Sequence, residues 1–203
     1  MSTHPGELSE PTAGIVSTQP LIHTLPPGQR LSRFHSASLD PIFFGKTASN
    51  RFDSPDSNYG VLYTGLDEHC AFIETFGQHT GIRFITTTEL HIRHLAYLEL
   101  TQPITLIDLA RSGGLARIGA DARLLAGSHS VSQKWSAALR AHPAGAHGIL
   151  YPTRHDPARL ACASFDLPTS VFKVTKAGSL LESRNAKLLG ELLDTYGFGL
   201  MSV

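Results

Sequence analysis

Five side chains in the first half of the chain are of the types that a nucleotide-cleaving site requires: Arg33, Arg51, Tyr59, Tyr63 and Glu74. The planar guanidinium group of an arginine matches the oxygens of a diphosphate, and a tyrosine ring offers a flat face to an aromatic base. A single carboxylate suits a reaction in which positive charge develops on a ribose ring. Together these groups are compatible with cleavage of the nicotinamide–ribose bond of NAD+.

Glu74 belongs to a segment that the sequence predicts to be a buried helix. Asp67 is a suitable N-cap, and the helix is expected to run to about Gln78. Its apolar side chains point in nearly all directions, and Glu74 falls in the angular gap between Cys70 and Ala71. Burying an unpaired carboxylate costs on the order of several kcal/mol. Two interpretations therefore stay open: a structural salt bridge with an arginine, or a catalytic role.

The arginine and tyrosine candidates lie on or beside short predicted strands. Tyr59–Thr64 is expected to be a strand just before the helix. Arg30–His35 is expected to be the first strand, with Arg33 on the same face as Leu31 and His35. An arginine inside such a strand is either an edge charge or a cation that faces a cleft.

The remaining segments predict an α+β fold, because strands come in runs with helices set between them instead of alternating regularly. Further strands are expected at residues 83–88, 95–100, 104–109, 148–151, 160–165 and 171–174. Further helices are expected at residues 115–126, 131–142 and 185–196, the second of them capped by Ser130. Residues 1–29 are rich in proline and predict a loosely ordered leader, which leaves residues 30–203 as a single domain.

Other chemical motifs are incomplete. His91 and His94 have helical ligand spacing without a convincing third ligand, so no metal is expected. His69 and Cys70 are adjacent and cannot pair on a helix. Gly113, Gly114 and Gly119 do not have the spacing of a dinucleotide fingerprint. The dipeptide His155-Asp156 lies in a polar turn and is interpreted as a solvated loop.

Composition points to a cytoplasmic protein. Seventeen basic residues balance seventeen acidic ones, which argues against direct binding of nucleic acid. No long apolar run predicts a membrane span, and no secretion signal is recognisable. Two cysteines in 203 residues suit a reducing compartment.

Four blocks of the sequence, in order, resemble the RES domain of RES–Xre toxin–antitoxin pairs. The resemblance extends from about Arg30 to Phe165, and the blocks are RLSRFH, NRF, YGVLYTGLDEHCAFIET and SQKWSAALRAHPAGAHGILYPTRHDPARLACASFD. It implies an ADP-ribosyltransferase-like fold in which two small mixed β-sheets form an NAD cleft with flanking helices. It also implies a toxin that cleaves NAD+, with an Xre-type antitoxin as its partner.

The resemblance assigns roles to individual residues. Arg33 and Arg51 would hold the phosphates or fix the nicotinamide end, and Tyr63 would stack on the nicotinamide. Glu74 would contact the nicotinamide ribose and stabilise the cation. The family serine aligns with Thr153 in GILYPTRHD, where the hydroxyl is kept and a methyl group is added. Tyr59 begins the block that contains Tyr63 and Glu74 and is counted with the NAD-binding residues.

Several alternatives share these residues. The same NAD site could serve a protein ADP-ribosyltransferase, and phosphate could replace water as the acceptor. The chain could also be a binding module that keeps the fold but has lost catalysis. The threonine at position 153, in place of the family serine, is the one feature that favours this alternative. An unrelated α+β protein would use Glu74 only for a salt bridge. Homodimerisation is compatible with each of these alternatives.

Overall fold

The chain folds around one bent eight-stranded mixed sheet, as a computed structural model describes it for residues 8–202. The strand order is β1-β6-β7-β8-β3-β2-β5-β9, and within these residues its neighbours are antiparallel except for β6 and β7. The strands are β1 (Ile22–Leu25), β2 (Arg30–Ser36), β3 (Val61–Gly65), β5 (Arg93–Leu100), β6 (Ile104–Asp108), β7 (Gly148–Pro152), β8 (Leu160–Phe165) and β9 (Phe172–Ser179). A separate small sheet pairs β4 (Phe84–Thr86) with β10 (Gly199–Met201) in parallel.

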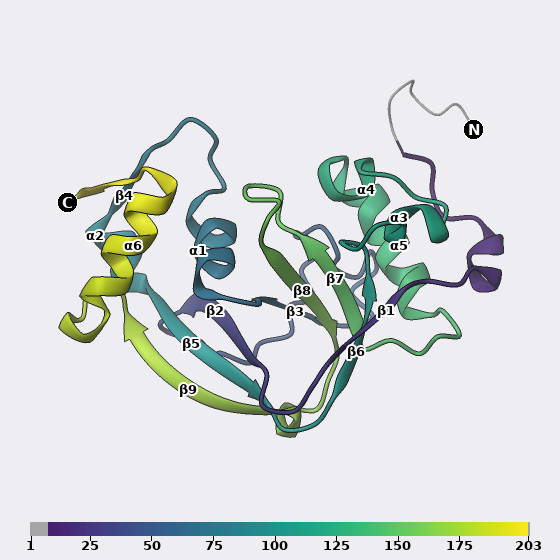
Figure 1. Ribbon diagram of the computed structural model, residues 1–203, viewed down its shortest axis with the longest axis horizontal. Coiled ribbons are helices and arrows are strands. Elements are labelled where there is room, and N and C mark those ends of the chain that lie inside the picture. Colours follow the sequence, from purple (N-terminus) through teal and green to yellow (C-terminus); the bar gives the residue numbers. More distant parts are fainter. Residues whose placement is uncertain (1–7, 203) are drawn as a thin grey trace.

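The large sheet divides in the middle, between β2 and β3. These two strands pair only at Ser32 and Gly65, whereas β2 pairs with β5 along its whole length from Arg30 to Ser36. The sheet therefore has two arms, β2-β5-β9 and β3-β8-β7-β6-β1, which diverge from this point (Figure 1). The α+β class is confirmed, and the expectation of two small mixed sheets is corrected to one large divided sheet with a two-stranded one beside it.

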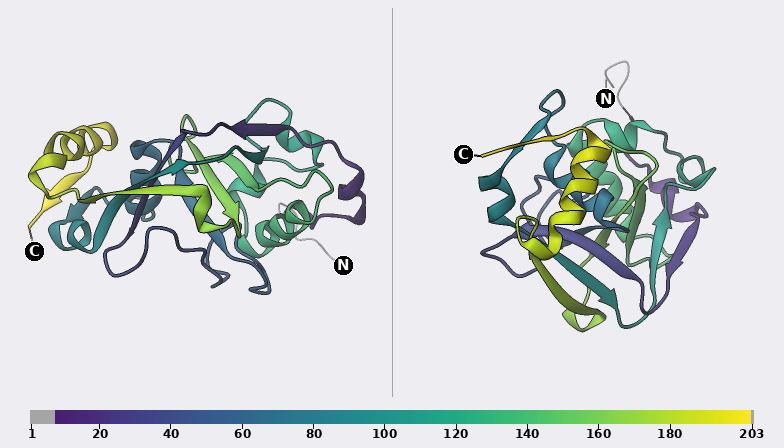
Figure 2. Two further views of the ribbon diagram at one scale, coloured as in Figure 1. Left: turned by 90° about the horizontal axis from the view of Figure 1, so that it is seen from below. Right: turned by 60° about the vertical axis from the view of Figure 1, so that its left-hand side comes forward.

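Helices cover the two arms in separate groups. They are α1 (Glu68–Phe76), α2 (Thr87–Ile92), α3 (Gly114–Arg117), α4 (Arg123–Ala126), α5 (His129–Arg140) and α6 (Ala186–Tyr196), with 3-10 turns η1 (Ala13–Ser17), η2 (Thr169–Val171) and η3 (Ser183–Asn185). α6 and β10 lie at one end of the molecule, and α3, α4, α5 and η1 lie at the other (Figures 1 and 2). α1 lies between them and contacts both β2 and β3, so it spans the place where the strands separate.

Helix α1 begins where the sequence predicts. The Asp67 side chain accepts a hydrogen bond of 2.7 Å from the backbone N–H of Cys70, which satisfies one of the free donors of the first turn. Gly65 allows the helix to approach β3 closely, because a Cβ at this position would lie 2.7 Å from the backbone nitrogen of Ala71. The end of β3 and the start of α1 are thus held against each other.

Apolar packing explains the two groups of helices. The α5 end is filled around Trp135 and Ile149, and Trp135 is a core residue as expected, its indole N–H donating to the carbonyl of Ser9. The α6 end is filled around Phe72 and Leu192. A third cluster lies along the strands and is centred on residues such as Leu31, Leu98, Leu106 and Leu150.

Several local expectations differ from the structure. The helix expected at residues 115–126 is two short helices, α3 and α4. Residues 83–88 are extended only over Phe84–Thr86, because the side chains of Thr86 and Glu89 form a capping box that starts α2. Helix α5 begins at His129, two residues before the expected start, and its N-cap position is Ser128, whose side chain makes no capping hydrogen bond. The described part of the expected leader, residues 8–29, contributes η1 and the edge strand β1 to the domain. Within residues 8–202 no helix is long and apolar enough to cross a membrane.

Candidate active site

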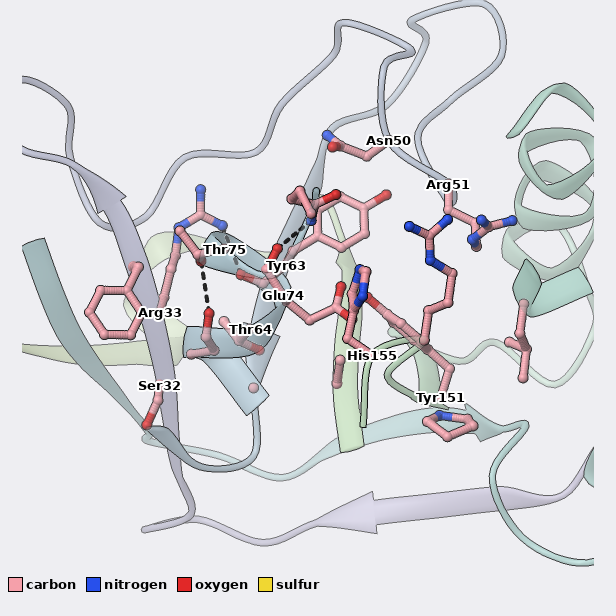
Figure 3. A pocket seen from close by; sticks show the side chains of 18 of the residues that line it. Ser32, Arg33, Asn50, Arg51, Tyr63, Thr64, Glu74, Thr75, Tyr151 and His155 are labelled. Atoms are coloured by element: carbon pink, nitrogen blue, oxygen red, sulfur yellow. Dashed lines mark hydrogen bonds between the residues drawn. The ribbon is translucent and has the colours of Figure 1, made fainter. Parts of the chain in front are cut away.

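A cleft of about 350 Å³ opens where β2 and β3 separate (Figure 3). One wall consists of β2 and α1, which contribute Arg33 and Glu74. The other consists of the loop at residues 50–51, parts of α4 and the start of α5, and the end of β7 with the loop that follows it. Its polar lining residues include Ser32, Arg33, Asn50, Arg51, Tyr63, Thr64, Glu74, Thr75, Gln78, Arg93, His129, Tyr151, Arg154 and His155.

Glu74 faces this cleft and is half-buried. The sequence predicted that this helix is buried all round, and that prediction is wrong on the side of the cleft. Helix α1 buries Cys70, Ala71, Phe72 and Ile73, whereas Glu74 faces the cleft. Among the described residues, its carboxylate has no hydrogen bond and no ion pair within 4.0 Å. The structure thus does not contain the salt bridge that one interpretation of Glu74 required.

Arg33 joins the two arms of the sheet. Its Nη1 donates a hydrogen bond of 2.8 Å to the main-chain carbonyl of Tyr63, beyond the last register pair of β2 and β3. Burial, and then the nearby Arg93, lower the pKa of the Arg33 guanidinium to about 10. Arg33 therefore stays charged at neutral pH, and its buried Nε has no hydrogen-bond partner in the described structure. It is a cation inside a cleft, not an edge charge.

Arg51 lies on the opposite wall, where its Nη1 donates to the carbonyl of Gly127 at 2.8 Å and to Oγ of Ser132 at 3.2 Å. Burial, and then Arg154, lower its pKa. Arg93 and Arg154 also line the cleft and are exposed. Four guanidinium groups thus line the same cleft as one carboxylate, and the cleft is electrostatically suited to an anion that carries several phosphate oxygens.

Tyr63 is held by a buried carboxylate that the sequence did not suggest. Its hydroxyl donates to Oδ1 of Asp53 at 3.0 Å and accepts from the backbone N–H of Phe52 at 2.9 Å. Asp53 is fully buried, and its Oδ2 also accepts from the backbone N–H groups of Ser49 and Asn50. Burial, and then Asp53, raise the pKa of Tyr63 well above its usual value. The ring is consequently fixed at the cleft as a protonated phenol.

Two of the candidate residues lie behind the cleft and do not line it. Tyr59 is buried in the core near α5, where its hydroxyl donates to Oγ of Ser136 at 3.1 Å. Thr153 is also buried, and its hydroxyl accepts a hydrogen bond of 3.2 Å from the backbone N–H of His155. Arg33, Arg51, Tyr63 and Glu74 are brought together, whereas Tyr59 and Thr153 support the walls.

Several cleft residues were not among the sequence candidates. His155, interpreted from sequence as part of a solvated loop, is half-buried and lines the cleft, as do Arg93 and Tyr151. Arg93 begins β5, which pairs with the strand that carries Arg33. Tyr151 lies at the end of β7, and His155 lies in the loop that follows. Local pattern gives no sign of this convergence, because it depends on which distant strands pair.

The cysteines do not take part in the site. Cys70 and Cys162 are both buried and free, and burial raises the pKa of the Cys162 thiol to about 12. A thiol in such surroundings is a poor nucleophile. Within residues 8–202, no group of three or more histidine, cysteine, aspartate or glutamate side chains could hold a metal ion.

The fold is shared with a solved toxin–antitoxin structure. A chain of the M. tuberculosis MbcT–MbcA toxin–antitoxin complex matches with a TM-score of 0.62 over 90% of this chain and 98% of its own, at 14% sequence identity. At that identity the likeness concerns the fold alone. No curated protein sequence matches this one.

The family follows from the sequence itself. The family model described as "RES domain" matches residues 27–182. This chain therefore belongs to the RES domain family, as the four blocks of the sequence predicted. The matched region contains all of the cleft-lining residues.

Proposed function

We propose that this protein is a RES-type toxin that hydrolyses the nicotinamide–ribose bond of NAD+. One observation carries the proposal: the Glu74 carboxylate, without a partner among the described residues, shares a cleft with Tyr63 and four arginines. A carboxylate without a structural partner is available to a developing cation. The arginines supply charge for a diphosphate, and the fixed phenol supplies an aromatic surface. Membership of the RES domain family and the structural similarity to a chain of a toxin–antitoxin complex support the same function.

In the proposed reaction, Arg33 and Arg51, with Arg93 and Arg154 at the rim, bind the phosphates of NAD+. Tyr63 contacts the nicotinamide ring. The bond between ribose C1′ and the nicotinamide nitrogen breaks with its electron pair leaving on nicotinamide. Glu74 stabilises the ribosyl cation, and water captures C1′ to give ADP-ribose. In this proposal the substrate is NAD+ itself, and no metal takes part.

An ADP-ribosyltransferase-like arrangement would place NAD+ between the two arms of the sheet. An enzyme that depletes NAD+ needs restraint in the cytoplasm, so we propose a cognate antitoxin of the Xre type as its protein partner. Contact with nucleic acid would then be made by the antitoxin, which agrees with the balanced charge of this chain.

The test is an NAD+ consumption assay with purified wild-type protein, Glu74→Gln and Glu99→Gln. Glu99 is an exposed glutamate on β5 outside the cleft, and its variant controls for the loss of one negative charge. We expect ADP-ribose and nicotinamide from the wild type and from Glu99→Gln, and at least a hundredfold slower reaction from Glu74→Gln. Full activity in a folded Glu74→Gln variant would contradict the mechanism.

NAD+ labelled in the adenylate part separates hydrolysis from transfer. Label recovered as free ADP-ribose supports hydrolysis. Label recovered on a protein after incubation with a cell lysate would instead identify a protein ADP-ribosyltransferase that uses the same cleft.

A further inference from the structure

His155 is a second titratable group in the cleft with no assigned role. It lies in the loop that connects β7 to β8 and is directed into the same cleft as Glu74 (Figure 3). Its backbone N–H donates to Oγ1 of Thr153. Its ring has no hydrogen bond with any of the residues that the structure describes. The imidazole is therefore uncommitted, as the carboxylate of Glu74 is.

The loop that carries His155 is tied to the helix that carries Glu74. Arg159 Nη1 lies 2.7 Å from Oδ2 of Asp67, the residue that caps α1. The Arg159 carbonyl accepts from the backbone N–H of Thr153 at 2.9 Å, and its own N–H donates to the carbonyl of Asp156 at 2.8 Å. Asp156 also accepts a hydrogen bond of 3.0 Å from the hydroxyl of Tyr196 on α6. This network fixes His155 relative to the start of α1.

The electrostatic surroundings keep the imidazole neutral. Burial, and then the positive charge of Arg154, lower the pKa of His155, and Glu74 opposes this shift. The net direction is downward, so at neutral pH the ring has a nitrogen lone pair that can accept a proton.

The other polar groups of the cleft are less suited to accept a proton. The arginines are charged, and the phenols of Tyr63 and Tyr151 have pKa values raised well above the ordinary value, mainly by burial. His129 is exposed, and its Nδ1 already lies 3.1 Å from the carbonyl of Ser49. Glu74 has to stay ionised beside the ribosyl cation in order to stabilise it.

We propose that His155 is the general base that activates the acceptor water in the reaction proposed above. The C1′–nitrogen bond breaks first, and nicotinamide leaves with the electron pair. A lone pair of the water oxygen then forms the bond to C1′ while His155 takes one proton from that water. The proton passes to solvent afterwards, so the histidine is regenerated. This inference rests on the proposed function.

The experiment separates bond cleavage from water capture. Exchange of labelled free nicotinamide into NAD+ requires cleavage of the C1′–nitrogen bond and re-formation of that bond with labelled nicotinamide. It does not require water to attack. Both rates are measured on wild type, His155→Gln, Glu74→Gln and His91→Gln, the last an exposed histidine of α2 outside the cleft. Glutamine keeps the approximate size and polarity of histidine but cannot act as a base at neutral pH.

For His155→Gln we expect hydrolysis to fall about a hundredfold, in the range typical of a lost general base, while nicotinamide exchange stays within about threefold of wild type. Glu74→Gln should lose both rates, and His91→Gln neither. If the rates of exchange and hydrolysis fall together in His155→Gln, or if neither rate falls, His155 is not the general base that activates water. If the wild type shows no cleavage of NAD+, the proposed function itself fails, and this result is distinct from the other two.

Discussion

The guanidinium group of Arg33 donates a 2.8 Å hydrogen bond to the carbonyl of Tyr63, across the line where β2 and β3 stop pairing. A side chain thereby replaces a ladder hydrogen bond that the diverging strands cannot make. The same arginine lines the cleft that the divergence creates. Arg33 is consequently a structural link between the arms as well as a cation for the ligand.

This double role predicts that substitutions of Arg33 reduce stability as well as activity. In Arg33→Met the Tyr63 carbonyl loses a charged donor, and we expect the free energy of unfolding to fall by about 2 kcal/mol. Chemical denaturation measures this loss. Arg93→Met removes another arginine of the cleft, one that is exposed, and should leave the unfolding midpoint almost unchanged. Equal midpoints for wild type and Arg33→Met would show that the link is energetically unimportant.

Removing the hydroxyl of Tyr63 should also lower the stability of the fold. Tyr63→Phe keeps the ring but leaves buried Asp53 without one donor and the N–H of Phe52 without its acceptor. We expect a loss of about 1–3 kcal/mol in the free energy of unfolding and an increased KM for NAD+, because the loop before Arg51 is loosened. Thermal melting and steady-state kinetics measure the two effects. A Tyr63→Phe protein as stable as wild type would contradict the role assigned to Asp53.

The sequence predicted the elements of the site better than its shape. β2 and α1 are found where alternation and the Asp67 cap placed them, since both signals are local, and β3 begins at Val61, two residues after the expected start. The separation of β2 from β3 depends on their other partners, β5 and β8, which lie much later in the sequence, and no local pattern encodes it. His155 was missed for a related reason: the Arg159–Asp67 contact that turns its loop toward the cleft joins residues far apart in sequence.

We expect the hydroxyl of Thr153 to matter more for NAD+ hydrolysis than its methyl group. The hydroxyl accepts from the N–H of His155, and the residue is buried. Thr153→Ser keeps that acceptor, and we expect NAD+ hydrolysis within about threefold of wild type. Thr153→Val removes the acceptor while keeping the shape, at a cost of about 1 kcal/mol, and we expect hydrolysis to fall further than with serine. Equal rates for the serine and valine variants would exclude a role for this hydrogen bond.

Acid should destabilise the fold through His35. This histidine is buried, its Nε2 has no partner in the described structure, and burial lowers its pKa. Arg33 and His94 shift that pKa in the same direction, although the carbonyls of Ser36 and Leu39 oppose it. Because protonation then favours the unfolded chain, stability is complete above the unfolded pKa of about 6.5 and is lost as pH falls below it.

The measurement for His35 compares unfolding midpoints at pH 8 and pH 5 for wild type and His35→Asn. Other groups that titrate in this interval affect both proteins, so the difference between the two slopes reports His35. We expect the slope of the variant to be smaller. Parallel slopes would mean that His35 is not a source of acid sensitivity.

Breaking the contact between Arg159 and Asp67 should displace His155 without changing any residue that lines the cleft. Arg159→Met removes a partly exposed ion pair, so the free energy of unfolding should change by less than about 1 kcal/mol. The loop that carries His155 loses its link to α1, and we expect the ratio of NAD+ hydrolysis to nicotinamide exchange to fall severalfold. Arg184→Met breaks a comparable exposed pair with Glu182 and should leave that ratio unchanged. If both variants keep the wild-type ratio, the loop holds His155 in place without Arg159, and the positioning role assigned to this ion pair is wrong.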